Sequence, residues 1–285
     1  MTLIEGKKVS EALRAELKEK TAQIKEKYGI APGLAVILVG EDPASTVYVR
    51  NKERACIELG YHSEVYRLPK ETTEDELLAL IEKLNSDSKI HGILCQLPLP
   101  SHISEEKVIL TISPDKDVDA FHPTNVGHIM EGKYSFLPCT PAGVMQLLKF
   151  YNIDVVGKEC VVVGRSNIVG KPMAMLLLNA SGTVTVCHSR TKNLKEVCKR
   201  ADIIVVAVGK PAFLTADMVK EGAVVIDVGI NRLDSGRLCG DVDFDEVSKL
   251  ASYITPVPGG VGPMTITMLM DNTLTAFFKI EGIKI

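Results

Sequence analysis

The sequence predicts an α/β protein with two domains, and two observations support this. Short continuous apolar runs, such as LAVILVG at 34–40, recur between longer charged segments with helical periodicity. This is the pattern of parallel strands that helices cover on both faces. A stretch rich in Pro, Asp and Asn at about 113–140 interrupts the alternation, and a second strand–helix series follows it. We therefore expect an N-terminal α/β domain and a Rossmann-like, doubly wound domain with a cleft between them.

The first domain is expected to comprise residues 1–140 together with the C-terminal helix 264–285. Its expected elements are, in order, a charged helix at about 8–28, a strand at 34–40, a helix that contains YVRNK, a strand near 63–68, a helix at about 74–85 capped by Thr72 or Thr73, and a strand at 91–96. We expect residues 113–140 to form loop and linker.

The second domain is expected to comprise residues 141–263 and to repeat the strand–helix order. Its expected elements are a helix near 141–151 and strands at 159–164, 183–188, 201–209 and 223–229. The tail GPMTITMLMDNTLTAFFKI predicts a strongly apolar helix.

Composition excludes several classes of protein. The 285 residues are 46% hydrophobic and 24% charged, which is typical of globular proteins, and the net charge of −3 argues against a nucleic-acid partner. No apolar run approaches the roughly 18 residues that cross a bilayer, and the N-terminus lacks a signal-peptide core. The seven Cys residues include no C-x-x-C pair, so we expect small core residues in a reducing compartment. We expect a cytoplasmic protein without membrane association.

A nucleotide site is predicted where VVVGRSNIVGKPM (161–173) places a buried strand before a glycine turn and a helix. The match to G-x-G-x-x-G is degenerate, because Ser166 and Val169 replace its second and third glycines. Neither a Walker A loop nor a G-x-S-x-G elbow fits the spacing. A phosphate can still bind at the turn after Gly164, where free N–H groups and the helix dipole favour an anion, and Arg165 adds a cation.

The next strand indicates which dinucleotide binds. An NAD site usually has a carboxylate at this strand end to accept the ribose 2′-hydroxyl. Here the strand ends at Cys187 and is followed by His188, Ser189 and Arg190. Ser189 can donate to a 2′-phosphate, and Arg165 or Arg190 can neutralise it, so we expect NADP rather than NAD. His188 is expected to have a packing role.

Tyr48 and Lys52 are four residues apart in a predicted helix, so their side chains project from one face. A lysine amine is a useful general acid or base only when burial and neighbours shift its pKa towards neutrality. An adjacent phenol can hydrogen-bond the amine or carry a proton.

Two further polar groups are candidates for the same site. Gln96 follows a buried strand and precedes the stiff segment LPLP, where its amide can pair with the edge of a heterocycle. A carboxylate of the run 115–121 can pair with the guanidine-like edge of a pterin and help set the protonation of Lys52. This run lacks the Gly and distal Glu of a calcium loop, so we expect no metal.

The segment TPVPGGVGPMT (255–265) precedes the last helix. Its three glycines permit a close backbone approach to a flat ligand, and its three prolines stiffen the chain. We expect a binding role for this segment.

Taken together, YVRNK, CQLPLP, KDVDAFHPTNVG, PCTPAGV, VVVGRSNIVGKPM, CHS, DVGIN and TPVPGGVGPMT resemble the bifunctional methylenetetrahydrofolate dehydrogenase/methenyltetrahydrofolate cyclohydrolase family, FolD. The resemblance covers the whole chain. It implies NADP-dependent oxidation of 5,10-methylenetetrahydrofolate to the methenyl form and hydrolysis of that product to 10-formyltetrahydrofolate, by a homodimer that needs no metal. Ala120 departs from the family's usual Gly, and Cys95 departs from its usual aliphatic residue.

The resemblance also implies roles for individual residues. Lys52 would be the essential catalytic residue, Tyr48 would position substrate, and Gln96 and Asp119 would bind the pterin and tune the lysine. NADP would be held by Gly164, Arg165, Ser166, Ser189 and Ile230. The tetrahydrofolate cleft would also include Leu97, Pro258, Gly259, Gly260, Val261, Gly262, Pro263, Met264, Thr265 and Ile266.

Three other protein classes fit less well. A short-chain dehydrogenase also uses Tyr-x-x-x-Lys, but its glycine-rich turn precedes that pair. A reductase resembling shikimate dehydrogenase would not explain CQLPLP or PGGVGPMT. A non-catalytic NADP sensor would not need Tyr48, Lys52, Gln96 and Asp119 together.

Overall fold

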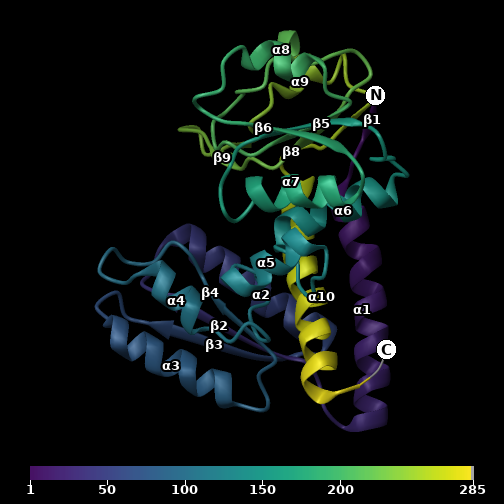
Figure 1. Ribbon diagram of the computed structural model, residues 1–285. Coiled ribbons are helices and arrows are strands. Elements are labelled where there is room, and N and C mark those ends of the chain that lie inside the picture. Colours follow the sequence, from purple (N-terminus) through teal and green to yellow (C-terminus); the bar gives the residue numbers. More distant parts are fainter. Residues whose placement is uncertain (284–285) are drawn as a thin grey trace. The chain divides into compact units, whose positions relative to one another are not determined.

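The computed structural model of the chain describes residues 1–283 and confirms the predicted α/β architecture with parallel sheets (Figure 1). Its chain divides into two compact units. We call residues 12–139 with residues 266–283 the Lys52 unit. We call residues 1–11 with residues 140–265 the Gly164 unit.

The Lys52 unit contains a three-stranded parallel sheet in the order β3-β2-β4. Its central strand is buried along its whole length, as the continuous apolar run predicts. The elements of this sheet and its connections are β2 (Gly33–Val39), α2 (Pro43–Leu59), β3 (His62–Leu68), α3 (Glu74–Ser86), β4 (Gly92–Cys95) and α4 (Glu105–Thr111).

Helix α3 shows why these helices cover the sheet. Its Leu77, Ile81 and Leu84 recur at helical spacing, are fully buried, and join a core with residues of β2 and β4. Thr73 caps the helix by a reciprocal capping box with Glu76. Of the two predicted caps, Thr73 is therefore the one that is used.

The prediction that residues 113–140 form only loop and linker is wrong in part. Helix α5 (Pro123–Glu131) lies within this stretch, and α6 (Cys139–Phe150) begins at its end. Proline indicated a loop from sequence, yet Pro123 occupies the first turn of α5, where a missing N–H costs nothing. Gly132 ends this helix in the left-handed conformation.

The Gly164 unit contains a six-stranded parallel sheet in the order β1-β11-β8-β7-β5-β6. The chain order reverses between β5 and β7, as in a doubly wound fold. The elements, besides α6, are β1 (Thr2–Leu3), β5 (Glu159–Val163), α7 (Gly170–Asn179), β6 (Thr183–Cys187), α8 (Leu194–Lys199), β7 (Ile203–Val206), the 3₁₀ turn Ala216–Met218, β8 (Val224–Asp227), the antiparallel pair β9 (Asn231–Arg232) and β10 (Leu238–Cys239), α9 (Phe244–Val247) and β11 (Tyr253–Ile254).

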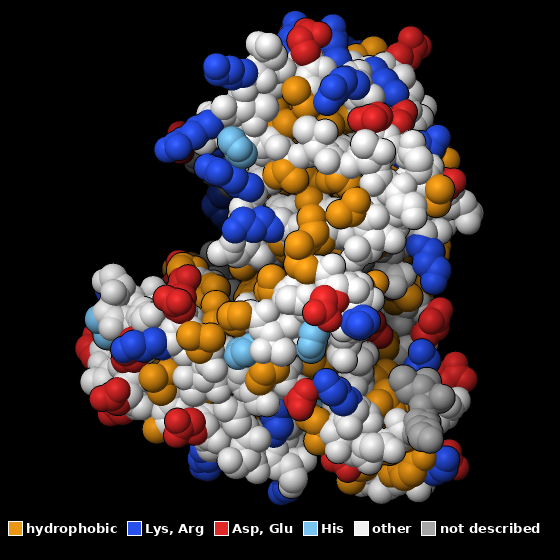
Figure 2. All heavy atoms as spheres, in the orientation of Figure 1, with side chains coloured by type: hydrophobic (Ala, Val, Ile, Leu, Met, Phe, Trp, Pro, Cys, Tyr) orange, Lys and Arg blue, Asp and Glu red, His pale blue; other side chains and the backbone are white. Residues whose placement is uncertain are grey.

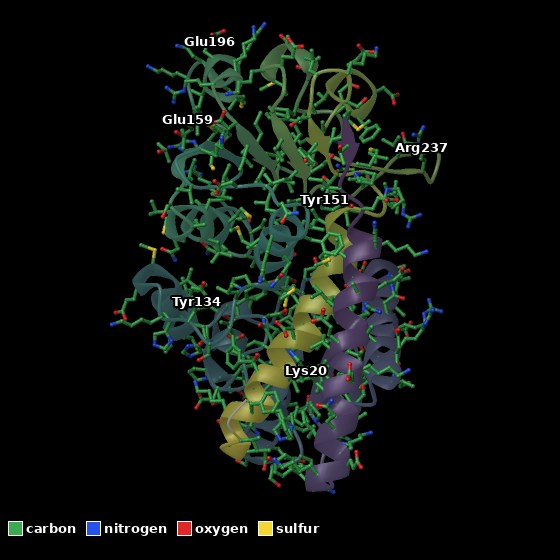
Figure 3. All side chains as sticks on the ribbon, turned by 90° about the vertical axis from the view of Figure 1, so that its right-hand side faces the viewer. Lys20, Tyr134, Tyr151, Glu159, Glu196 and Arg237 are labelled. Atoms are coloured by element: carbon green, nitrogen blue, oxygen red, sulfur yellow. The ribbon has the colours of Figure 1, made fainter. Side chains whose placement is uncertain are left out.

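The N-terminal residues lie with the Gly164 unit, whereas the sequence placed them with the first domain. The reason is pairing over a long sequence distance, because β1 lies in register beside β11. The backbone N–H of Glu5 also donates to the hydroxyl of Tyr151 at 2.9 Å, and Figure 3 shows Tyr151 beside the start of α1. A strand of only two residues is too short to produce a recognisable pattern of apolar residues in the sequence.

Two long helices contribute residues to both units: α1 (Gly6–Tyr28) and α10 (Val261–Glu281). Within the Lys52 unit they lie side by side (Figures 1 and 3), and Arg14 Nε donates to Thr267 Oγ1 at 3.0 Å. Helix α10 matches the apolar helix predicted for the tail. None of the helices within residues 1–283 combines the length and the apolar character needed to traverse a bilayer.

Candidate active site

Helix α2 carries Tyr48 and Lys52 and begins at a capped end. The side chain of Asp42 accepts from the N–H of Ser45 at 2.8 Å, Pro43 stands in the first turn, and Gly60 closes the helix. Tyr48 is 42% exposed, whereas Lys52, one turn later, is only 9% exposed. The two side chains share a face of the helix, but the amine lies inside the protein and the phenol lies at its surface.

Gln96 is the hydrogen-bond partner of the buried lysine. Lys52 Nζ donates to Gln96 Oε1 at 2.9 Å. The other end of the amide, Gln96 Nε2, donates to the carbonyl of Leu97 at 2.7 Å, which fixes the amide with its oxygen towards the lysine. The N–H of Gln96 extends the sheet by donating to the carbonyl of Ile37 at 2.8 Å. The carboxyl edge of the sheet therefore brings together two of the predicted site residues.

Asp119 lies next to this pair in a loop held against β4. The N–H of Ile93 donates to the carbonyl of Lys116 at 2.8 Å, and the buried Asp117 accepts from Asn125 Nδ2 at 2.8 Å. The carboxylate of Asp117 therefore holds the loop. Asp119, which is half-buried, is the carboxylate of this run whose charge acts on Lys52. Ala120, where the family commonly has Gly, takes a left-handed φ of 57° that glycine adopts more readily.

Burial sets the electrostatics of the site. Desolvation lowers the pKa of Lys52, and the nearby charge of Asp119 offsets part of that shift. Desolvation raises the pKa of Asp119, and Lys52 in turn opposes that rise. Burial therefore favours the neutral amine over the ammonium. A neutral amine held by Gln96 can accept a proton, which is what a general base requires.

Two residues that the sequence analysis did not single out support Asp119. The thiol of Cys139 donates to Asp119 Oδ1 at 3.6 Å, and burial raises the pKa of this thiol well above its ordinary value. Asn272 Nδ2, on α10, donates to the carbonyls of Val118 and Leu137, both at 2.8 Å. The sequence could have indicated Asn272, because it places a side-chain amide within a strongly apolar predicted helix. Cys139 gave no signal beyond lying in the PCTPAGV motif.

Leu97 and Asp119 also line a small pocket in the Lys52 unit, together with Cys95 and Phe121. The peptide bond between Leu97 and Pro98 is cis. Within residues 1–283, His, Cys, Asp and Glu side chains form no group of three that could hold a metal ion.

The predicted nucleotide turn follows β5. Gly164 has a φ of 132°, and a Cβ there would lie 2.3 Å from the carbonyl oxygen of Ala207. A Cβ at Gly170 would lie 2.4 Å from the carbonyl oxygen of Gly164, so the turn folds tightly onto the start of α7. Ser166 Oγ accepts from the N–H groups of Val169 and Gly170, both at 3.2 Å, and so holds the turn against the start of α7. Arg165 and Ser166 are exposed.

The turn after β6 lies beside the Gly164 turn, since the N–H of Gly164 donates to the carbonyl of Cys187 at 2.9 Å. Ser189 and Arg190 are exposed there, and His188 Nδ1 accepts from the N–H of Arg190 at 3.1 Å. His188 therefore shapes the turn, as expected of a structural residue. Figure 2 shows Lys and Arg side chains gathered along one margin of the face it presents of this unit. A tight glycine turn with exposed cations and hydroxyls fits the phosphates of a dinucleotide.

The segment from Pro258 to Ile266 comprises a turn at residues 258–260 and the first residues of α10. The peptide bond before Pro258 is cis, and Gly259 has a φ of 103°. A Cβ at Gly260 would lie 2.5 Å from the carbonyl oxygen of Pro256, so only glycine fits there. Thr265 Oγ1 lies 3.0 Å from Thr140 Oγ1. Residues Val261–Glu281 form α10, so the second part of this segment lies in the helix.

Comparison with known families gives two matches along the chain. Residues 4–119 match "Tetrahydrofolate dehydrogenase/cyclohydrolase, catalytic domain", and residues 138–281 match "Tetrahydrofolate dehydrogenase/cyclohydrolase, NAD(P)-binding domain". The two matches divide at the same point in the chain as the strand–helix series.

Known proteins and solved structures resemble the chain over nearly its full length. "Bifunctional protein FolD" from Acetivibrio thermocellus is 64% identical over 274 residues, which are 96% of each chain. The crystal structure of the FolD methylenetetrahydrofolate dehydrogenase/cyclohydrolase from Campylobacter jejuni matches with a TM-score of 0.96 and 57% identity, over 98% of this chain and 99% of that one. The Trypanosoma brucei FolD structure, complexed with NADP cofactor and an inhibitor, matches with a TM-score of 0.94 and 40% identity over 98% of both chains.

Proposed function

This chain belongs to the tetrahydrofolate dehydrogenase/cyclohydrolase family, and we propose that the buried contact of Lys52 with Gln96 is the centre of its active site. The enzyme oxidises 5,10-methylenetetrahydrofolate to 5,10-methenyltetrahydrofolate with NADP⁺. It then hydrolyses the methenyl product to 10-formyltetrahydrofolate. The hydrogen bond at 2.9 Å from a desolvated amine to a fixed amide is the observation that supports the proposed role of Lys52.

In the first reaction, the main contribution of the protein is to orient the substrate and the cofactor. NADP⁺, when bound, accepts a hydride from the methylene bridge of the substrate. Gly164, Arg165 and Ser166 would hold its phosphates at the start of α7, with Ile230 beside them. Arg165, Ser166 and Ile230 are exposed, and the tight turn at the buried Gly164 supports a close approach of the backbone.

The second reaction needs a base. The methenyl group is a cation and already an electrophile, so water can attack it without a metal. Neutral Lys52 takes the proton of that water as the carbon–oxygen bond forms. The resulting ammonium returns a proton to the ring nitrogen as the carbon–nitrogen bond breaks. The hydroxyl group of the adduct then loses its proton to solvent, which gives the formyl product. Gln96 keeps the amine in place through both steps.

The remaining site residues are assigned to substrate binding. Asp119 is a half-buried carboxylate and would pair with the guanidine-like edge of the pterin. Tyr48, with its exposed ring, would pack against the substrate beside Lys52. Leu97 would line the folate site of the Lys52 unit, and the segment from Pro258 to Ile266 is assigned to ligand binding. We assign catalysis to the Lys52 unit and NADP binding to the Gly164 unit.

Replacing Lys52 by Met removes the base but keeps an unbranched apolar side chain in the buried position. We expect hydrolysis of methenyltetrahydrofolate to fall by about 10²-fold to 10⁴-fold, which is the usual contribution of general base catalysis. Hydride transfer needs no base, so NADPH should still form and methenyl product should accumulate. Absorbance of the two products, recorded together, measures both rates.

A matched control is Lys18→Met, which changes an exposed lysine of α1 in the same way. This variant should keep both activities. Near-normal hydrolysis by Lys52→Met would contradict the assignment of Lys52 as the base.

We further propose that Ser189 and the arginines around it select NADP. The strand β6 ends without a carboxylate, and Ser189 and Arg190 are exposed at that end. Replacing Ser189 by Asp places a negative charge where the 2′-phosphate would bind. We expect the KM for NADP⁺ to rise by about tenfold or more, through like-charge repulsion, and the KM for NAD⁺ to stay the same or fall.

Ser181→Asp serves as the control, because Ser181 is exposed at the other end of β6. Steady-state kinetics with both cofactors give the comparison. An unchanged preference in Ser189→Asp would remove Ser189 from the cofactor site.

Assembly and location follow from the family and the cysteines. We infer a homodimer in the cytoplasm that binds neither nucleic acid nor membrane and needs no metal. Six of the seven free cysteines are buried and the seventh is partly exposed, which suits a reducing compartment. Light scattering of the purified protein should give twice the chain mass of 31.0 kDa. A mass of one chain at micromolar concentration would contradict the dimer.

A further inference from the structure

Asp241 is a fully buried carboxylate outside the site around Lys52. Its Oδ2 accepts from the N–H of Val208 at 2.6 Å and from the N–H of Gly209 at 2.9 Å. Its Oδ1 accepts from the N–H of Lys210 at 2.9 Å and from Asn231 Nδ2 at 2.9 Å. Three successive backbone N–H groups thus converge on one internal carboxylate, a concave arrangement that elsewhere binds free anions.

A second buried carboxylate holds Asp241 itself. Asp227 Oδ1 accepts from the N–H of Asp241 at 2.9 Å and from the N–H of Gly229 at 3.0 Å, and its Oδ2 accepts from the N–H of Val242 at 3.0 Å. The fit is close, because a Cβ at Gly229 would lie 2.2 Å from Asp241 Oδ1. The two carboxylates form one connected network of hydrogen bonds to N–H groups.

The loops that this network holds lie beside the predicted cofactor turn. Residues 208–210 follow β7, which pairs with β5 along its whole length. Ala207 connects β7 to residues 208–210. A Cβ at Gly164 would lie only 2.3 Å from its carbonyl oxygen. The chain order reverses between β5 and β7, and ligands of open α/β sheets bind at such a point.

The second segment that the network holds contains a predicted cofactor contact. This contact is Ile230, which is 48% exposed. The residue before it, Gly229, donates its N–H to Asp227, and the residue after it, Asn231, donates its side-chain amide to Asp241. One buried carboxylate therefore connects the loop after β7 to the segment after β8. Both loops are otherwise exposed at Gly209, Lys210 and Ile230, where little packing could hold them.

We propose that Asp241 is a positioning residue for NADP, which holds the loop 208–210 and the segment 229–231 in the shape that the cofactor binds. This rests on the proposed function, in that NADP is the ligand of the Gly164 turn. Because Asp241 occupies the N–H groups of residues 208–210, those groups are not available to a phosphate. The phosphates are then directed to the Gly164 turn, and the loops held by Asp241 shape the rest of the cofactor site.

The test uses Asp241→Asn in the full-length enzyme. The amide keeps one oxygen but turns N–H donors towards the backbone N–H groups that a carboxylate oxygen accepted. We expect the Kd for NADPH, measured by titration calorimetry, to rise by about tenfold to a hundredfold, as for loss of hydrogen bonds to a charged group. Hydrolysis of added methenyltetrahydrofolate needs no cofactor, so its kcat and KM should stay within about twofold.

Two more variants complete the experiment. Asn231→Ala removes a single donor to Asp241 and should weaken NADPH binding less than Asp241→Asn does. It also keeps the proposal testable if Asp241→Asn does not fold. Asp245→Asn makes the same chemical change at an exposed position four residues along the chain and should bind NADPH as the wild type does.

The outcomes separate this inference from the proposed function. Unchanged NADPH binding in both Asp241→Asn and Asn231→Ala would overturn the positioning role. An equal loss of NADPH binding and of methenyl hydrolysis would also overturn it, because it would show a general structural role. A wild-type enzyme that neither binds NADPH nor turns over folate would instead refute the proposed function.

Discussion

The desolvation of one amine is the constraint on which the catalytic half of the molecule depends. A lysine at the surface would be an ammonium at neutral pH and could not take a proton from water. Burial of Lys52 on α2 lowers its pKa, and Gln96 accepts the hydrogen bond that a buried amine needs. The sheet provides this partner, since Gln96 follows β4 at the carboxyl edge of the sheet, and α2 begins after β2 at the same edge.

The two units differ in where their assigned functional side chains lie. In the Lys52 unit, Lys52 is buried and Asp119 half-buried, and neighbours such as Cys139 are supports for them. In the Gly164 unit, the side chains assigned to NADP, those of Arg165, Ser166, Ser189 and Ile230, are exposed and can contact a charged ligand. Buried carboxylates, Asp227 and Asp241, lie beneath them and shape the loops. Buried ionisable groups serve proton transfer in the Lys52 unit and hold loops in the Gly164 unit.

The sequence predicted the parts that depend on local pattern. Continuous apolar runs located the main parallel strands, and the spacing of Tyr48 and Lys52 placed both on one face of a helix. It did not predict β1 or its partner β11, because two-residue strands form only through pairing across the fold. The sequence also did not predict that Cys139 supports Asp119 or that Asp241 holds two loops. These hydrogen bonds join residues that are distant in the chain.

The most direct test of the account is to compare the pKa of Lys52 with the pH dependence of methenyl hydrolysis. NMR of protein labelled at the lysine ε-carbons, with Lys52→Met to assign the signal, gives the first quantity. Burial lowers this pKa, so the account predicts a pKa below the ordinary 10.5 and a rate that rises with pH through the same value. Asp119→Asn, which removes a charge that raises the pKa, should move both midpoints to lower pH together. A Lys52 that titrates with the exposed lysines, or a rate that does not follow its titration, would contradict the account.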